Sequence, residues 1–241
     1  MEYLEADQLE ELAQFATPTV SNAIESFNVR RDTEGYMRPS VKSILQYEKP
    51  IVGYAQTAKI SAAEPPEDQE KKQELTTQYL TNLYESPAPT ISVIEDTDGE
   101  PIGSFWGDVN ASIHLALGCK GVVTNGGVRD LDDVKELGFR FFAQEVLVSH
   151  AYVHIVDVDS PVEVGGLEVR PGDLLHADKH GVLAVPHEIA PELPEACREV
   201  EEAEDIVIDE CKKKIGKEKI EIDRLQALRQ KMYEHRDQVR G

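Results

Sequence analysis

Apolar residues near the start of the chain recur at helical spacing. Leu9, Leu12 and Phe15 lie three positions apart and predict a first short helix. The segment TPTVSNAIESF then predicts a second helix, with Thr17 as its N-terminal cap and Pro18 in its first turn. Two short helices are therefore expected before the first strand.

The pattern then changes to that of a strand. Residues 51–62, IVGYAQTAKISA, include many β-branched and small residues and carry no helix signals, and the Pro65-Pro66 pair ends the segment. Residues 67–85 are rich in good helix formers, with apolar residues at helical spacing. A strand followed by a surface helix is the expectation.

The middle of the chain alternates between the two patterns. Residues 90–96, 107–117 and 121–124 predict a strand, a helix and a strand, an arrangement that is typical of parallel sheets. After a double-glycine turn at 126–127, a short helix and another strand within 140–146 repeat the unit. These segments indicate an α/β fold.

The last part of the chain shows two different sequence patterns. Residues 152–185 predict short strands separated by SP, GG, RPGD and HG turns, hence antiparallel or mixed sheet. Residues 188–214 and 217–239 predict two helices whose charge density is too high for a self-contained bundle. We therefore expect one main domain at 1–186 and a C-terminal helical extension at 187–241, packed on the core or on a neighbouring subunit.

Composition excludes several classes of protein. The 46 acidic and 25 basic side chains give a net charge of -21, which repels phosphate-rich partners and argues against nucleic acid. The first residues lack the basic start and apolar stretch of a secretory signal, and no apolar run is long enough for a membrane span. The three cysteines have no CxxC spacing, which argues against a disulfide framework and a zinc site. These features predict a soluble, cytoplasmic protein.

The candidate chemistry lies in residues 106–138. The strand at 121–124 runs directly into NGGVRD, and ligands of parallel sheets collect at the carboxyl ends of strands. Arg129 and Asp130 would be delivered at that edge. A simple surface ion pair is the alternative interpretation of this dipeptide. No GxGxxG or GxxxxGK[ST] motif occurs, so nucleotide cofactors are not indicated.

Chemistry on a 2-oxo acid would use this set of groups. Carbon–carbon cleavage beside a ketone, or loss of carbon dioxide, passes through an enolate, which a fixed positive charge stabilises. A hard divalent cation supplies such a charge, and a guanidinium can hold the substrate carboxylate by two hydrogen bonds. Arg129 fits the guanidinium role, while the helix beginning near Gly107 offers amide donors. Asp130 is then a metal ligand, and Asp108 an acceptor that orients metal-bound water.

The spacing of these residues carries a family resemblance. Asp108, twenty intervening residues and Arg129-Asp130 within GVVxxGGVRD resemble the signature of the 4-hydroxy-4-methyl-2-oxoglutarate aldolase and regulator of ribonuclease activity A family. The similarity extends from TPTVSNAIE through GYAQTAKI to VRPGDLLHADKHGVLAVP at 169–186. It implies a swivelling β/β/α fold and a homotrimer or hexamer. It also implies metal-dependent aldol cleavage of 4-hydroxy-2-oxo acids to pyruvate, with oxaloacetate decarboxylation.

The resemblance also implies roles for individual residues. The substrate loop falls on Gly107, Asp108, Val109 and Asn110, the catalytic, substrate-binding arginine on Arg129, and the ligand of Mg²⁺ or Mn²⁺ on Asp130. Asn125 and Asn22 depart from the family pattern, because aspartate is frequent at both places. Each departure removes a negative charge near the presumed site.

Several alternatives stay open at the level of sequence. Glu195 and Glu199 are candidates for a general base from a neighbouring subunit, but nothing singles one out. His176, Asp178 and His180 alternate and could bind a metal on one face of a strand, although the family has a structural turn there. The function could also be that of a non-catalytic regulator that binds a protein such as a ribonuclease. A third possibility is a lyase or hydratase acting on a related sugar acid.

Overall fold

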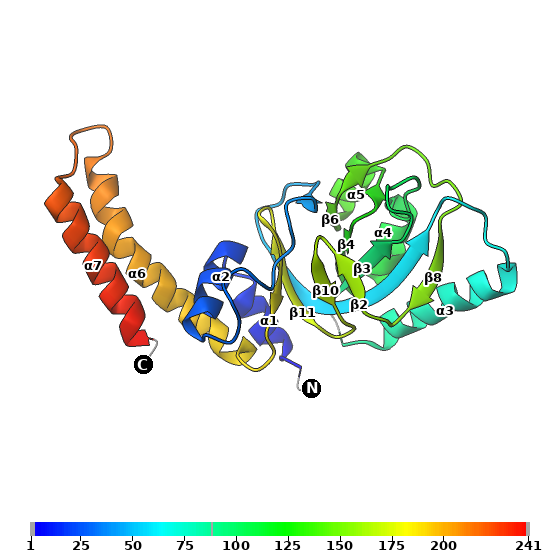
Figure 1. Ribbon diagram of the computed structural model, residues 1–241, viewed down its shortest axis with the longest axis horizontal. Helices are drawn as coiled ribbons and strands as arrows, with labels where there is room; N and C mark the ends of the chain where they lie inside the picture. The colour runs from blue at the N-terminus through cyan, green and yellow to red at the C-terminus, as the bar shows by residue number, and fades with distance from the viewer. Residues whose placement is uncertain (1–2, 88, 240–241) are drawn as a thin grey trace.

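The computed structural model describes residues 3–87 and 89–239 and shows an α/β body from which a pair of helices projects (Figure 1). The strands of the main sheet are β1 (Lys42–Ser43), β2 (Ile51–Ser61), β3 (Thr90–Asp96), β4 (Cys119–Thr124), β6 (Arg140–Ala143), β8 (His154–Val158), β11 (Leu174–Asp178) and β12 (Gly181–Val185). Two small ribbons pair β5 (Gly127–Val128) with β7 (Glu145–Val146) and β9 (Val162–Val164) with β10 (Leu167–Val169). The helices are α1 (Ala6–Leu12), α2 (Thr17–Ser26), α3 (Gln69–Glu85), α4 (Asp108–Ala116), α5 (Leu131–Leu137), α6 (Leu193–Lys214) and α7 (Ile222–Val239), with a 3₁₀ turn at Ala190–Glu192.

The main sheet mixes parallel and antiparallel pairing. Its order is β1-β6-β4-β3-β2-β11-β12, and the four strands β2, β3, β4 and β6 are parallel. The start of β2 pairs with β11 and its end with β8, both antiparallel, while β3 lies along its other edge. Because neighbours flank β2 on both sides, its residues 51–58 are all buried. The mixed sheet and the swivelling β/β/α architecture confirm the expected fold class.

Three helices cover one face of the main sheet. The helices α3, α4 and α5 contribute Tyr79, Ala111 and Val134 to one buried cluster, which also holds Trp106 and Phe139. The helix α4 connects β3 to β4, and α5 lies between β5 and β6. The strand–helix–strand units expected from sequence are therefore confirmed.

The start of α2 is capped in a way that the sequence did not indicate. The cap residue is Ala16, not Thr17, and Ala16 offers no side-chain oxygen. Asp178 from β11 instead accepts a hydrogen bond from the Thr17 N–H at 3.0 Å, and the Thr17 hydroxyl contacts Nδ1 of His176 at 2.9 Å. A carboxylate distant in sequence therefore takes the place of a local cap. Its negative charge also complements the positive end of the helix dipole.

The two C-terminal helices pack differently. The first half of α6 buries residues such as Leu193, Cys197 and Val200 in the cluster that α1 and α2 share with the sheet. Beyond it, α6 and α7 form a hairpin that extends away from the body, with Ile215 and Ile222 exposed at its turn (Figure 1). Among the residues that the structure describes, no helix has the length and hydrophobicity to cross a membrane.

Candidate active site

The candidate site lies where β4 and β5 end. After β4 the chain turns through Asn125-Gly126, forms the short strand β5 and delivers Arg129 and Asp130 just before α5. The Arg129 N–H donates to the Trp106 carbonyl at 3.0 Å, which ties this segment to the loop before α4. Two stretches about twenty residues apart in sequence thus meet at one sheet edge.

The backbone of Asp130 directs its carboxylate away from its own helix. Asp130 has a left-handed conformation (φ 57°) and stands at the cap position of α5, yet its side chain makes no cap hydrogen bond. Its Oδ2 instead accepts a hydrogen bond from the Asp108 N–H at 3.3 Å and lies 3.5 Å from Nε of Arg129. Aspartate adopts the left-handed conformation only uncommonly. At Asp130 this less favourable backbone conformation directs the carboxylate toward α4.

Gly107 makes room for that carboxylate. An added Cβ at this position would lie 2.2 Å from Asp130 Oδ2 and 3.3 Å from Arg129 Nε, although the backbone of Gly107 is extended and accepts any residue. Steric room, not conformation, therefore requires glycine here. Gly107 is also the cap of α4, and the first amide of that helix, the Asp108 N–H, donates to the same carboxylate.

The remaining residues of the expected substrate loop form the first turn of α4. Oδ1 of Asp108 accepts a hydrogen bond from the Val109 N–H at 2.8 Å, and Val109 is largely exposed. The Asn110 amide donates to the Phe105 carbonyl, which fastens the loop to the helix. The side chains of Arg129 and Asp130 are about one-third exposed, at 36% and 31%, so a small molecule can reach both.

Comparison with known proteins places this arrangement in a family. A family model described as RraA-like, Aldolase/RraA, matches residues 17–184, which is most of the chain. The chain belongs to the RraA-like family.

Individual relatives of this RraA-like chain are distant. An uncharacterized protein of Methanocaldococcus jannaschii is 27% identical over 76% of this chain and 84% of its own. A protein of Halalkalibacterium halodurans, provisionally named 4-hydroxy-4-methyl-2-oxoglutarate aldolase, is 24% identical over 77% of this chain and 80% of its own. The crystal structure of Streptomyces coelicolor RraAS2, titled an unusual member of the RNase ES inhibitor RraA protein family, has a TM-score of 0.67. It covers 85% of this chain and 97% of its own at 22% identity, which shows a shared fold.

Asn125 of this RraA-like chain makes hydrogen bonds that aspartate could not reproduce. Its amide oxygen accepts from the Asp96 N–H at 2.7 Å, and its amide nitrogen donates to the Asp96 carbonyl at 2.9 Å. A carboxylate has no donor for the second bond. The departure from the family pattern therefore fastens the end of β3 to the turn after β4.

Asp96 is a residue that sequence reasoning did not select. It is 4% exposed, and its Oδ2 has no hydrogen-bond partner among the described residues. Burial raises the pKa of this carboxyl group, although the Asp98 N–H that donates to Oδ1 opposes the shift. The only sequence signal is a carboxylate that ends an otherwise apolar strand, TISVIED.

Asn22, the second departure, lies away from this site. It is on α2, and its amide donates to Oε1 of Glu204 on α6 at 3.1 Å. Figure 1 shows α2 and α6 on the opposite side of the body from α4 and α5. The expectation that Asn22 changes the charge near the site is therefore wrong within one chain, because α2 packs on the C-terminal helix.

His176 has a structural environment. His176 is buried, with Nδ1 on the Thr17 hydroxyl and Nε2 3.3 Å from the Leu12 carbonyl. Burial alone would raise the pKa of Asp178, but hydrogen bonds from the Thr17 and His180 N–H groups lower it. Within residues 3–87 and 89–239, no three His, Cys, Asp or Glu side chains form a group that could hold a metal. Among the described residues, the 176–180 segment therefore forms no group of three ligands, and neither do Asp108 and Asp130 with their neighbours.

Two buried histidines predict a loss of stability in acid. Burial lowers the pKa of His176 and of His114 from 6.5 to about 4. The unfolded chain takes up these protons near pH 6.5 and the folded chain only near pH 4, so the free energy of unfolding should fall as the pH drops between these values. The expected slope is about 1.4 kcal/mol per pH unit for each histidine.

Urea unfolding at several pH values between 7.5 and 4 measures this slope. The His114→Gln variant should lose about half of the dependence assigned to the pair, whereas His150→Gln, at an exposed position, should keep all of it. The same slope in His114→Gln as in the unaltered chain would contradict the assignment to buried histidines.

Proposed function

We propose that this RraA-like protein is a divalent-metal-dependent lyase that cleaves 4-hydroxy-2-oxo acids to pyruvate and decarboxylates oxaloacetate. The observation that carries the proposal is the meeting of three groups at one sheet edge. These are the Asp130 carboxylate, the Arg129 guanidinium and the start of α4 at Gly107. The provisional aldolase name of the Halalkalibacterium relative supports the same class of reaction.

Arg129 is the group that recognises the acid. Its side chain is about one-third exposed and lies beside Asp130, so part of its hydrogen-bonding edge is available to a substrate carboxylate. As the enolate forms, the same fixed charge stabilises the developing oxyanion. In the first turn of α4, the Val109 N–H donates to Oδ1 of Asp108. It would become a donor for a further oxygen of the substrate when Asp108 turns to metal-bound water.

The carboxylates of Asp130 and Asp108 suit a loosely held divalent cation. Mg²⁺ is commonly bound by only one or two protein carboxylates, with water completing its shell, and Mn²⁺ accepts the same oxygen ligands. When bound by Asp130, with Asp108 orienting its water, Mg²⁺ or Mn²⁺ would polarise the 2-oxo group. The left-handed backbone at Asp130 supports this role because it turns the carboxylate away from α5.

A second subunit takes part if Glu195 or Glu199 is the general base. Glu195 and Glu199, the candidates for a general base, lie on α6, away from α4 and α5 in one chain (Figure 1). Glu195 is also paired with Arg198. Either glutamate could reach the site only from a neighbouring chain, which is consistent with a homotrimer or hexamer.

We expect light scattering of the full-length chain at micromolar concentration to give a trimer or a hexamer. The exposed isoleucines at the turn of the α6–α7 hairpin make that hairpin the candidate for subunit contacts. Removal of the chain after Gly216 is the suitable truncation, because the first half of α6 belongs to the core. A full-length monomer would exclude this proposal, and an unchanged oligomer in the truncated chain would move the contact elsewhere.

A panel of 2-oxo acids tests the function directly. Purified protein with Mg²⁺ or Mn²⁺ should release pyruvate from 4-hydroxy-2-oxo acids and from oxaloacetate, and excess chelator should stop the release. Turnover of sugar acids alone would favour the related lyase or hydratase. A folded protein without turnover on any acid would favour a non-catalytic regulator.

A further inference from the structure

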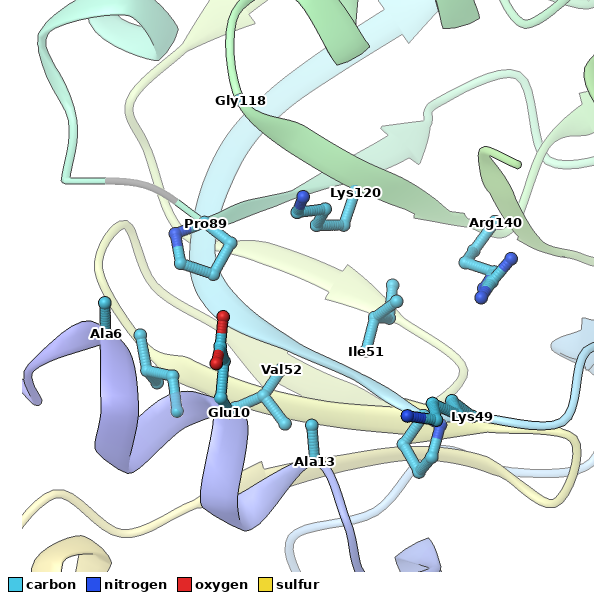
Figure 2. Close-up of a pocket in the computed structure, with 12 residues that line it drawn as sticks. Ala6, Glu10, Ala13, Lys49, Ile51, Val52, Pro89, Gly118, Lys120 and Arg140 are labelled. Atoms are coloured by element: carbon cyan, nitrogen blue, oxygen red, sulfur yellow. The ribbon is translucent and has the colours of Figure 1, made fainter. Parts of the chain in front are cut away.

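A cavity lies at the edge of the parallel strands opposite the candidate active site. It has a volume of about 480 Å³ and lies where β2, β3, β4 and β6 begin, facing α1. The candidate active site lies where β4 and β5 end, so the cavity and that site lie at opposite ends of the parallel strands. The lining is Ala6, Leu9, Glu10, Ala13, Lys49, Pro50, Ile51, Val52, Pro89, Gly118, Lys120 and Arg140 (Figure 2).

The charges around this cavity reverse the balance of the whole chain. Acidic residues outnumber basic ones by 46 to 25 overall, but the lining holds Lys49, Lys120 and Arg140 against the single acid Glu10. Within residues 3–87 and 89–239, none of these three cations has a carboxylate within 4.0 Å. The three come from separate segments, so local sequence does not explain why they meet.

Arg140 supplies a positive charge at a fixed position. Its guanidinium carbon lies 3.4 Å from the centre of the Tyr47 ring, and its Nη1 donates to the Gly138 carbonyl at 3.1 Å. Its Nε is buried without a hydrogen-bond partner among the described residues, and burial lowers the pKa of the side chain. A cation that is partly desolvated and held in place is prepared to bind an anion, because little ordering is left to do on binding.

The rest of the lining is apolar. Figure 2 shows Ile51 and Val52 along the floor, with Glu10 extending from α1 and Lys120 on the facing strand β4. Lys49 and Lys120 are exposed, so their charges face solvent at the mouth. Apolar walls with a few converging polar groups are typical of sites for small molecules, and the volume is within their usual range.

We propose that this cavity binds a small organic dianion that carries an apolar body, of the class of phosphate monoesters or dicarboxylates. Three cations less the charge of Glu10 leave a net charge of two to be balanced. The apolar floor selects for a hydrocarbon or ring beside the charged groups. A long polyanion would extend beyond the cavity and be repelled by the net charge of -21. A small ligand stays within one screening length of the three cations, roughly 8 Å at physiological salt.

Calorimetric titration at physiological ionic strength tests this site with defined probes. Phenyl phosphate and phthalate represent the two sources of a dianion on an apolar ring, inorganic phosphate represents the charge alone, and benzyl alcohol represents the ring alone. At least one of the two dianions should bind with a Kd below about 1 mM, which corresponds to roughly 4 kcal/mol. Inorganic phosphate and benzyl alcohol should each bind at least tenfold more weakly.

Charge variants of opposite sign make the test specific. Lys120→Gln should weaken binding of the tighter dianion about tenfold, and Glu10→Gln should strengthen it, since each changes one exposed charge at the mouth in opposite directions. Lys219→Gln removes the same charge from an exposed position outside the lining and should leave Kd within about twofold. Arg129→Lys separates this site from the candidate active site, and it too should leave Kd unchanged.

The outcomes are distinct. Absence of binding by both dianions, or equal effects of Lys120→Gln and Lys219→Gln, would overturn the proposal. Loss of binding in Arg129→Lys would also overturn it, because the probe would then occupy the other edge of the sheet. Pyruvate release is measured separately, so failure of the proposed function leaves this result intact.

Discussion

Replacement of Asp130 by asparagine is expected to lower kcat/KM for pyruvate release about 1,000-fold, because a bound cation contributes several kcal/mol of charge stabilisation. Asparagine keeps an oxygen to accept the Asp108 N–H and tolerates the left-handed backbone, so the change removes the negative charge with little effect on the fold. A cation held by one or two carboxylates would then lose its main protein ligand. Pyruvate release with added Mg²⁺ or Mn²⁺ measures the loss, and Mn²⁺ binding followed by paramagnetic resonance gives an independent readout.

Two further variants sharpen this experiment. Asp132→Asn removes the same charge from an exposed position in the first turn of α5 and should leave both activity and Mn²⁺ binding near the original values. Gly107→Ala keeps every charge but introduces a Cβ 2.2 Å from Asp130 Oδ2, so it should displace the carboxylate and lower activity. Full activity of Asp130→Asn, or undiminished activity in excess chelator, would remove the metal role from Asp130.

Replacement of Arg129 by lysine is expected to lower kcat as well as raise KM. Lysine keeps the charge but lacks the planar group that can hold a carboxylate by two hydrogen bonds while facing the enolate oxygen. Loss of a charged hydrogen bond in such a site costs about 2 to 4 kcal/mol, hence roughly 30- to 1,000-fold in kcat/KM. Steady-state kinetics on the substrate found in the panel measures both constants.

The fold should survive this substitution, because the Arg129 side chain is 36% exposed and its backbone N–H, not its guanidinium, holds the Trp106 carbonyl. A melting curve beside the kinetics checks this point. Arg31→Lys makes the same chemical change at an exposed position and should be silent. A folded Arg129→Lys protein with unchanged turnover would show that the guanidinium takes no part in the chemistry, and its remaining role would be that of a surface ion pair.

These two experiments separate the two parts of the proposed chemistry. The Asp130 variant asks whether a carboxylate is needed to hold a cation, while the Arg129 variant asks whether a guanidinium is needed beyond its charge. A protein that loses turnover in both, yet loses Mn²⁺ binding only in Asp130→Asn, would have the division of roles proposed for this site.

Much of the secondary structure follows from local sequence. The alternation of strand and helix patterns between residues 90 and 143 predicted β3, α4, β4, α5 and β6 in order. The helices bury one face at the helical period, whereas the strands are short apolar runs that are buried almost throughout. The placement of Arg129-Asp130 after a strand and a double-glycine turn also came from sequence, since residues that follow parallel strands collect at one edge. Their roles in catalysis and metal binding stay predictions.

Other features depend on contacts between distant segments. Asp178 caps α2 across more than 150 residues of chain, so the local reading that placed Thr17 at the cap was wrong. The two hydrogen bonds of Asn125 to Asp96, and the packing of α2 on α6 that takes Asn22 away from the site, likewise join residues far apart in sequence. Local patterns report which face of an element is apolar, but not which partner that face meets.

The sequence by itself determined the α/β class, the order of most elements and the position of the Arg129-Asp130 pair along the chain. Only the tertiary structure decided that the Asp130 carboxylate turns toward the start of α4, and that Gly107 leaves the space for it. It also decided that Lys49, Lys120 and Arg140 meet around one cavity. The physical reason is that periodicity and propensity act over a few neighbouring residues, whereas charge, steric room and hydrogen bonding act wherever folding brings side chains together.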